Sequence, residues 1–380
     1  MALKLAARSD VTPFLVMEVM RAAAERAASG KEVLHLEVGQ PGFPAPTGAR
    51  RAAIQAIESE YLGYTDTFGI PPLRAQIQKH YKSIYGMDVA DARIAATTGS
   101  SAGFLLAFLA CFEPGDRVAL ADPSYPCYRN ILKACSIEAV KIPVDASTNF
   151  QPTPEDIAKL GDIQGVVVAS PSNPTGSMFA PGELLRLAGW CHDHGVRLIS
   201  DEIYHGLTYG KEAETAASSP SAIVINSFSK YFAMTGWRIG WAVLPEDVAG
   251  NFDRLAQSIY ISAPTISQIA AAAAFDCRDE LESYKRVYAQ NRTELLDALV
   301  ARGLNPVAPP DGAFYIYVDV SPLSNDSGAL CQEMLDEIGV AATSGYDFEP
   351  ENGGRYMRFS YCTGHDDVVE AARRIRTWRT

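Results

Sequence analysis

The sequence lacks a hydrophobic run long enough to cross a membrane. Its most apolar stretch, Phe104–Phe112, is far below the ~20 residues that a membrane-spanning helix needs. The first ten residues contain no continuous apolar core, so we expect no signal peptide. These absences predict a cytoplasmic protein with no membrane partner.

Positive charge is also scarce. The chain has 33 lysines and arginines against 45 aspartates and glutamates, which gives a net charge of −12. This balance argues against nucleic acid as a partner, since nucleic-acid-binding proteins present a basic surface. It does not exclude a small anion held in a local basic pocket.

Paired or clustered cysteines are missing. The seven cysteines form no CxxC pair and no group with histidine. An odd number of scattered cysteines is typical of reduced thiols in the cytoplasm rather than of a disulfide framework. The same scatter argues against a zinc site, and we expect no metal.

Glycine-rich nucleotide motifs, internal repeats and low-complexity tracts are absent as well. There is no GxGxxG and no P-loop, so neither a dinucleotide nor a nucleoside triphosphate is indicated. What remains is an ordinary globular composition, with 47% hydrophobic and 21% charged residues. A length of 380 residues suggests two or three domains.

Short β-rich segments alternate with longer helical ones between about residues 95 and 245. Helices are predicted at Phe104–Phe112 and between Pro181 and Gly195. The predicted strands are Arg93–Thr98, Arg117–Ala121, Gly165–Ala169, Val196–Ser200, Ile223–Asn226 and Ile239–Val243. This alternation predicts an α/β fold in which a mostly parallel sheet lies between helices, an α/β/α arrangement.

The pattern changes in the last quarter of the chain. A long helix is predicted over Glu280–Arg302, followed by strands at Phe314–Val318 and Tyr356–Tyr361. We expect these elements and the N-terminal helix Phe14–Ser29 to form a smaller, discontinuous α+β domain. The predicted division is a large cofactor-binding domain of residues 46–275 and a small domain of residues 1–45 and 276–380.

Lys230 follows an apolar strand in the segment Ser227-Phe-Ser-Lys230. Alone it reads as a surface lysine whose stem lies on apolar neighbours. The alternative is a nucleophilic amine that forms a Schiff base, which needs shelter from bulk water and a lowered pKa. The nearby Ser227 and Arg238 favour this alternative, because hydroxyls and a guanidinium suit a phosphate. A second phosphate element is Gly99-Ser-Ser101 at a strand-to-helix turn, where serines are also ordinary helix caps.

Asp201 ends another apolar strand. It is either the cap of the following turn or a carboxylate that keeps a heteroaromatic nitrogen protonated, which makes such a ring an electron sink. Asn173 and Tyr204 could donate hydrogen bonds to an oxygen on that ring, and Tyr125 could stack on its face. Because ligands bind beyond the carboxyl ends of parallel strands, we expect these residues to share one site.

Together these pieces resemble the class I/II aminotransferases, the aspartate-aminotransferase-like enzymes of fold type I that use pyridoxal 5′-phosphate. The resemblance covers nearly the whole chain. Its most specific parts are Ser170-Pro-Ser-Asn-Pro-Thr-Gly176, Asp201-Glu-Ile-Tyr204 and Ser227-Phe-Ser-Lys230 followed by Thr235-Gly-Trp-Arg238. It implies an enzyme that moves an amino group from an L-amino acid to a 2-oxo acid by a ping-pong mechanism.

The resemblance also implies roles for single residues. Lys230 would bind the cofactor as a Schiff base and then carry the substrate proton, with Asp201 at the ring nitrogen and Tyr204 at the ring oxygen. Asn173 would share the ring oxygen, and Tyr125 would stack on the ring. The phosphate would be bound by Ser100, Ser101, Ser227 and Arg238.

Substrate and partner follow from the same resemblance. Gly39, Asn173 and Arg358 would bind the substrate carboxylate. Tyr64 matches a tyrosine that reaches the phosphate of the neighbouring subunit, which implies a homodimer with a shared active site. We also expect Ile70, Tyr125 and Tyr260 to line an apolar pocket, and Pro13-Phe-Leu15 to act as a lid.

Two alternative functions stay open at this stage. Carbon–sulfur β-lyases that depend on pyridoxal phosphate share the same residues. A non-catalytic, cofactor-binding sensor is a second alternative from another class of protein.

Overall fold

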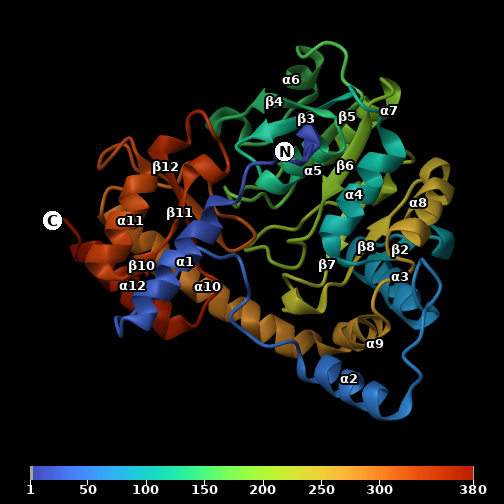
Figure 1. Ribbon diagram of the computed structural model, residues 1–380, viewed down its shortest axis with the longest axis horizontal. Helices are drawn as coiled ribbons and strands as arrows, with labels where there is room; N and C mark the ends of the chain where they lie inside the picture. Colours follow the sequence, from blue (N-terminus) through green and yellow to red (C-terminus); the bar gives the residue numbers. More distant parts are fainter. Residues whose placement is uncertain (1–2, 380) are drawn as a thin grey trace.

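The computed structural model describes residues 3–379 (Figure 1). The first two residues of the chain, with which the predicted small domain and the N-terminal stretch without an apolar core begin, lie outside the described residues. The predicted small domain also ends outside them, at residue 380.

The α-helices are α1 (Leu15–Ala28), α2 (Thr47–Ser59), α3 (Pro71–Tyr85), α4 (Gly99–Cys111), α5 (Pro126–Ala134), α6 (Pro154–Ala158), α7 (Glu183–Asp193), α8 (Glu246–Ile259), α9 (Thr265–Ala274), α10 (Arg278–Ala301), α11 (Ser327–Ile338) and α12 (His365–Thr377). The strands are β1 (Leu34–His35), β2 (Ile94–Thr97), β3 (Arg117–Asp122), β4 (Glu138–Pro143), β5 (Gly165–Ala169), β6 (Arg197–Asp201), β7 (Ile223–Ser227), β8 (Gly240–Val243), β9 (Tyr315–Asp319), β10 (Val340–Ala341), β11 (Thr343–Ser344) and β12 (Tyr356–Ser360). Short 3-10 turns are η1 (Ala7–Ser9), η2 (Asp91–Arg93), η3 (Ala146–Thr148), η4 (Ala216–Ser218), η5 (Thr235–Trp237), η6 (Phe275–Cys277), η7 (Gly345–Asp347) and η8 (Gly353–Arg355).

The larger sheet has seven strands in the order β2-β8-β7-β6-β5-β3-β4. Strand β8 is antiparallel to both of its neighbours, and the other pairings in the sheet are parallel. Helices cover the sheet, as Figure 1 shows. The predicted α/β fold with a mostly parallel sheet is therefore confirmed.

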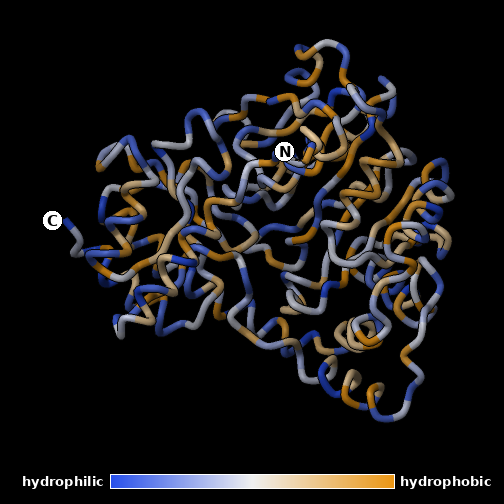
Figure 2. Tube along the Cα trace, in the orientation of Figure 1, coloured by the Kyte–Doolittle hydropathy of each residue, from blue (hydrophilic) through white to orange (hydrophobic). Residues whose placement is uncertain are grey.

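Burial on both faces explains why the central strands read as continuous apolar runs. In β5, Val166 and Val168 belong to one buried cluster, whereas Val167 belongs to the cluster on the opposite face. Side chains of a strand alternate between faces, so a strand covered on both sides needs apolar residues at every position. Figure 2 shows this hydrophobic colouring around the larger sheet and hydrophilic colouring on outer loops.

Strand β4 is the element of this sheet that the sequence analysis missed. It lies at the edge, where β3 is its partner in the sheet. Of its residues, Ile142 is buried, whereas Glu138, Lys141 and Pro143 are exposed. An edge strand with charged and proline residues does not show the apolar pattern of a central strand.

A smaller three-stranded sheet lies in the C-terminal part, with antiparallel strands in the order β11-β12-β9. Strand β1, near the start of the chain, pairs in parallel with β10, near its end. Helix α1 packs beside α11, and the long helix α10 extends from α9 toward this part (Figure 1). Two distant segments of the chain thus share one layer.

Within the described residues, no helix is long and apolar enough to span a membrane. Over residues 3–379, no three or more His, Cys, Asp or Glu side chains gather where they could hold a metal ion.

Candidate active site

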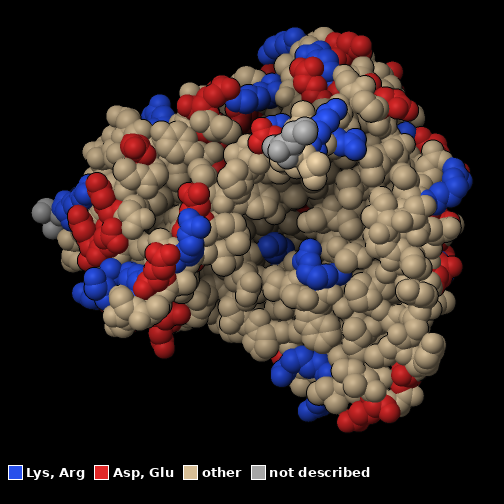
Figure 3. Space-filling model, viewed as in Figure 1, with Lys and Arg blue, Asp and Glu red and all other residues tan. Residues whose placement is uncertain are grey.

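A cavity of about 290 Å³ lies at the carboxyl ends of the strands of the larger sheet, between this sheet and the C-terminal part. Figure 3 shows a hollow on this side of the molecule with Lys or Arg side chains inside it. Most of the residues predicted from sequence line the cavity: Gly39, Ser100, Ser101, Tyr125, Asn173, Asp201, Tyr204, Lys230, Arg238 and Arg358.

Lys230 directs its amine into this cavity from the segment after β7. Its Nζ donates a hydrogen bond to the carbonyl oxygen of Gly39 at 2.7 Å and lies 5.8 Å from the ring centroids of Tyr204 and Phe314. Burial lowers the pKa of Lys230 to about 8, since the charged ammonium loses its hydration. At pH 7 roughly a tenth of this amine is therefore neutral and nucleophilic, far more than for an ordinary lysine.

Asp201 ends β6 at the bottom of the cavity and is only 2% exposed. Its carboxylate accepts hydrogen bonds from the hydroxyl of Tyr128 and from the backbone N–H of Ile203. Burial raises the pKa of Asp201 to about 6, and both hydrogen bonds oppose this rise. The site therefore holds an ionisable carboxylate that a nearby cation would keep charged.

The opposite end of the cavity is built to receive an anion. Helix α4 begins at Gly99, and its first turn carries Ser100 and Ser101. The guanidinium of Arg238 packs against Gly99, where an added Cβ would lie 2.5 Å from Nη2. Free amides at a helix N-terminus, hydroxyls and a guanidinium together suit a phosphate.

Ser227 does not itself line the cavity. Its hydroxyl donates to Ser229 Oγ at 3.0 Å, and Ser229 is the serine that lines the cavity. Ser229 therefore lies between Ser227 and the cavity. A direct contact of Ser227 with a bound phosphate stays a prediction.

Arg358 is a buried arginine on β12. Its Nη1 donates to Asn173 Oδ1 at 2.8 Å, and its Nη2 donates to the carbonyl of Glu37 at 2.6 Å. The guanidinium lies over the rings of Tyr315 and Phe348, at 4.3 and 4.7 Å from their centroids. Its Nε–H is buried with no partner among the described residues. A buried, rigid guanidinium with a free donor is suited to a carboxylate.

Tyr204 and Asn173, the two predicted donors to the ring oxygen, are held in place by further hydrogen bonds. The hydroxyl groups of Tyr204 and Tyr315 are 2.9 Å apart, and both side chains are buried. Because Asn173 Oδ1 already accepts from Arg358, its amide nitrogen remains available as a donor. Both predicted donors are therefore positioned in the cavity wall.

Helix α1 closes one side of the cavity with apolar side chains: Phe14, Val16, Met17 and Met20. The carboxylate of Asp347 accepts hydrogen bonds from the backbone N–H groups of Leu15 and Val16, at 3.0 and 3.3 Å. This carboxylate accepts hydrogen bonds from otherwise free N–H groups in the first turn of α1. Its negative charge also interacts favourably with the positive end of the helix dipole. Phe14, from the segment predicted as a lid, thus forms part of the wall.

Some predicted residues lie elsewhere. Tyr64 is 83% exposed and does not line the cavity of its own chain. Ile70 and Tyr260 do not line it either, because Ile70 faces a separate surface groove near α2 and Tyr260 packs against α4 and α8. Tyr125 is the member of the expected apolar pocket that lines the cavity.

Three contributing residues were missed from the sequence: Tyr128, Tyr315 and Asp347. Tyr128 carried a usable signal, because it lies three residues after Tyr125 at the start of a helix and so faces the same side. Tyr315 and Asp347 had none, since their partners lie 111 and 332 residues away in the chain.

Comparisons with known proteins agree with one another. Residues 31–375 match the family model described as aminotransferase class I and II. A valine–pyruvate aminotransferase of Mycobacterium tuberculosis is 47% identical over 99% of this chain and 98% of its own length. An aspartate aminotransferase of Pyrococcus horikoshii is 30% identical over 94% of this chain and 93% of its own.

Solved structures give the same result. The crystal structure of an aminotransferase from Mycobacterium tuberculosis has a TM-score of 0.97, 46% identity and 99% coverage of both chains. A Thermus thermophilus aspartate aminotransferase has a TM-score of 0.92, 30% identity and the same coverage. These matches favour transamination over the lyase and sensor alternatives.

Proposed function

Because the chain belongs to the class I and II aminotransferases and transfers an amino group between an amino acid and a 2-oxo acid, we propose that it does so with pyridoxal 5′-phosphate held at Lys230. We further propose an amino donor with an apolar side chain, pyruvate as the acceptor and a ping-pong order of two half-reactions. A relative bearing the name valine–pyruvate aminotransferase, 47% identical, supports this choice.

The observation that carries the substrate proposal is the charge of the cavity wall. Among the described residues that line it, the basic ones are Lys230, Arg238 and Arg358. In the proposal Lys230 binds the cofactor, Arg238 contacts its phosphate and Arg358 binds the substrate carboxylate. None of this chain's described lining residues supplies a further cation for a second carboxylate, and the α1 side is apolar, so a hydrocarbon side chain is favoured.

The residues present fit the proposed cofactor. Ser100, Ser101 and Arg238 would hold its phosphate, with Ser227 supporting this end through Ser229. Asp201 would hold the proton on the ring nitrogen, and the raised pKa of this carboxyl is lowered again when it faces a cation. The remaining ring contacts would come from Asn173 and Tyr204 at the ring oxygen and from Tyr125 on the ring face.

The chemistry divides between cofactor and protein. When bound, the cofactor supplies an electron sink for the electron pair left at the substrate Cα after deprotonation. Nζ of Lys230 would accept that proton, since its lowered pKa lets it act as a base near neutral pH. Arg358 would bind the carboxylate and orient the Cα–H bond, Gly39 would line this end, and the side chains of α1 would exclude water.

A shared active site in a homodimer is the second part of the proposal. Tyr64 is exposed, together with the apolar side chains of Ile54, Ile57 and Tyr61. Figure 3 shows a broad area with few charged side chains beside the hollow. We propose that a second copy covers this area and that Tyr64 reaches the partner's phosphate site.

We also retain the domain division at residues 46–275 against 1–45 and 276–380, which the pairing of β1 with β10 supports. A cytoplasmic location is proposed because the seven cysteines are free.

The substrate proposal is tested with a panel of amino donors. We expect kcat/KM for L-valine with pyruvate to exceed that for L-aspartate roughly 100-fold, because an aspartate side chain would place an unpaired carboxylate against apolar residues. Equal use of L-aspartate would refute the proposed donor class. Pyruvate and ammonia released from cystathionine without an oxo acid would favour a lyase instead.

The cofactor and dimer proposals need separate measurements. Borohydride reduction followed by peptide mapping should locate the cofactor on Lys230, and Lys230→Ala should lose this adduct whereas Lys159→Ala keeps it. Mixing Tyr64→Phe with Lys230→Ala subunits should give more activity than either variant alone, since one site of the hybrid has both residues intact. No gain on mixing would contradict the shared site.

A further inference from the structure

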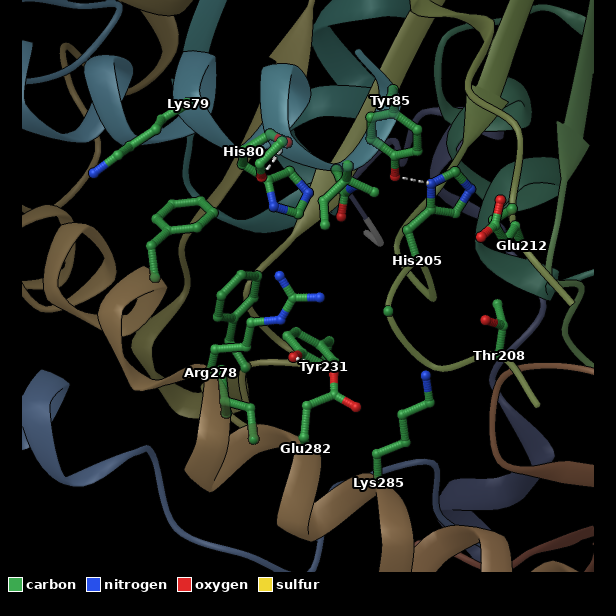
Figure 4. Close-up of a pocket in the computed structure, with 18 of the residues that line it drawn as sticks. Lys79, His80, Tyr85, His205, Thr208, Glu212, Tyr231, Arg278, Glu282 and Lys285 are labelled. Atoms are coloured by element: carbon green, nitrogen blue, oxygen red, sulfur yellow. Dashed lines mark hydrogen bonds between the residues drawn. The ribbon is translucent and has the colours of Figure 1, made fainter. Parts of the chain in front are cut away.

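A second and larger cavity, of about 820 Å³, lies on another side of the larger sheet. It is enclosed by α3, the loop after β6, strands β7 and β8, and the first turns of α10 (Figure 4). It has no lining residue in common with the candidate active site. Its volume is in the range of small-molecule sites, which is about 300–1,000 Å³.

The inner wall of this cavity is aromatic. The ring of Phe275 lies 5.0 Å from that of Phe232 and 5.5 Å from that of His80, measured between centroids, and Tyr231 and Trp241 complete the wall. Burial lowers the pKa of His80 to about 4, so the imidazole is neutral at physiological pH. Such a wall favours a flat, apolar body.

The donors of this cavity are not satisfied by the protein. Asn226 is 3% exposed; its Oδ1 accepts from the N–H of Ser227, and its amide nitrogen has no partner among residues 3–379. The side chains of Lys79, Arg278 and Lys285 form no ion pair and no hydrogen bond with a described residue. In Figure 4 the guanidinium of Arg278 and the amine of Lys285 point into the cavity.

Two of the three acidic side chains of the cavity accept hydrogen bonds from neutral donors. Glu282 accepts a hydrogen bond from the hydroxyl of Tyr231 at 2.7 Å, and Asp276 accepts one from Gln76. Glu212 is the third carboxylate of the lining. Lys211, a fourth cation of the lining, is paired with Asp311, so the unpaired donors of Asn226, Arg278 and Lys285, rather than the net charge of the cavity, favour an anion.

We propose that this cavity binds a small aromatic carboxylate at a site separate from the active site. The ring would lie against Phe275 and Tyr231, and the carboxylate would accept from Arg278 and Lys285, with Asn226 as a neutral donor. A planar anion satisfies both features of the cavity, whereas an apolar molecule would leave the cations unpaired and a bare phosphate would leave the aromatic wall exposed.

The test uses 1-naphthoate, an aromatic carboxylate that has neither an amino nor an oxo group and so is not a substrate. Binding to the cofactor-loaded protein is measured by titration calorimetry and by the fluorescence of the tryptophans, of which Trp241 lines the cavity. The double variant Arg278→Gln/Lys285→Gln should weaken binding about tenfold, the expected effect of losing two partly exposed charge contacts. The control Lys159→Gln/Arg186→Gln removes two surface charges elsewhere and should leave binding unchanged.

Arg358→Gln separates this site from the active site. It should abolish carboxylate binding in the active site and leave 1-naphthoate binding at the second cavity intact. Absence of binding up to about 10 mM would overturn the proposal. Binding that is lost in Arg358→Gln, or weakened equally by the control pair, would overturn it too. Because activity of the Arg278→Gln/Lys285→Gln variant checks its folding, failure here is distinct from failure of the proposed aminotransferase reaction.

Discussion

Asp201 is the residue whose surroundings say most about the proposed chemistry. It is buried, yet it keeps two hydrogen-bond donors, one of them the hydroxyl of Tyr128. A buried carboxylate without such donors would be protonated more readily and would hold a ring cation less well. Tyr128 is therefore a positioning residue that acts through Asp201.

Tyr128→Phe tests this role. The pKa of Asp201 should rise further once the hydroxyl is lost, because this hydrogen bond lowers it. We expect kcat to fall about tenfold, within the usual size of acid–base effects, and the pH at which the bound cofactor changes its visible absorbance to shift. Tyr284→Phe removes another tyrosine–carboxylate hydrogen bond, to Glu280, and serves as the control. An unchanged absorbance profile in Tyr128→Phe would contradict the assignment.

At the scale of elements, helix α1 depends on a residue from the far end of the chain. Asp347 accepts from the first N–H groups of α1, and α1 supplies the apolar wall of the active site. Since α1 packs beside the C-terminal strands, the substrate pocket is assembled from both ends of the sequence.

Asp347→Ala should loosen the start of α1. The expected loss is about 1 kcal/mol of local stability, the usual effect of removing a helix cap. KM for an apolar amino donor should rise more than kcat falls, and proteolysis within the first turn should become faster. Asp326→Ala removes a similar cap from α11 and should raise KM much less. Equal changes in both variants would show that the wall formed by α1 is not specific to substrate binding.

A second connection links α3 to the loop that carries Asn173. The hydroxyl of Tyr85 donates to Nδ1 of His205 at 2.6 Å, and Nε2 of His205 donates to the carbonyl of Ser170 at 3.0 Å. Burial lowers the pKa of His205 to about 3, so the ring is neutral. Its single N–H is then at Nε2, and Nδ1 is the acceptor.

Tyr85→Phe should destabilise the protein by about 1–3 kcal/mol, because a buried imidazole nitrogen is left without its donor. The measurement is the free energy of unfolding from denaturant titration. Tyr288→Phe is the matched control, since the hydroxyl of Tyr288 is buried with no partner among the described residues and its removal should cost nothing. A larger loss in the control would refute the role given to the Tyr85 hydroxyl.

We expect Glu202 to contribute to the pH dependence of the stability of the whole protein. This carboxyl is buried beside His205, and its Oε2 has no hydrogen-bond partner among residues 3–379. Burial raises the pKa of Glu202 to about 8. The folded state therefore binds a proton that the unfolded state releases, and this stabilising contribution is lost as pH rises from the ordinary value of 4.5 to about 8.

Glu202→Gln should flatten this pH dependence. Each unit by which the pKa differs between the folded and unfolded states corresponds to about 1.4 kcal/mol of stability. The free energy of unfolding of the variant should therefore rise relative to that of the parent protein as pH rises from 5 to about 8. His205 acts in the opposite direction below pH 6.5, and comparison of the two proteins at each pH removes its effect. Melting temperatures across this range give the measurement, with the exposed Glu246→Gln as control. Parallel curves for parent and Glu202→Gln would rule out a buried, protonated carboxyl.

The central strands and most of the residues of the candidate site could be predicted from the amino-acid sequence. Strand β5 was predicted at its observed bounds, because burial on both faces requires an uninterrupted apolar run. Asp201 and Lys230 were singled out because ligands of a parallel sheet bind beyond the carboxyl ends of its strands, where both residues lie. Both features depend on a few adjacent residues, which a sequence displays directly.

The contacts between distant residues of the site depend on the folded arrangement of the chain. Asp347 meets α1 across 332 residues, Arg358 meets Asn173 across 185, and Tyr128 reaches Asp201 across 73. The sequence pointed to Asn173 and Arg358 and held a signal for Tyr128, but the partner of each residue follows only from how the sheets and helices pack. The second cavity has the same origin, since Asn226 of β7, Phe275 of η6 and Lys285 of α10 line it together although they are far apart in the chain.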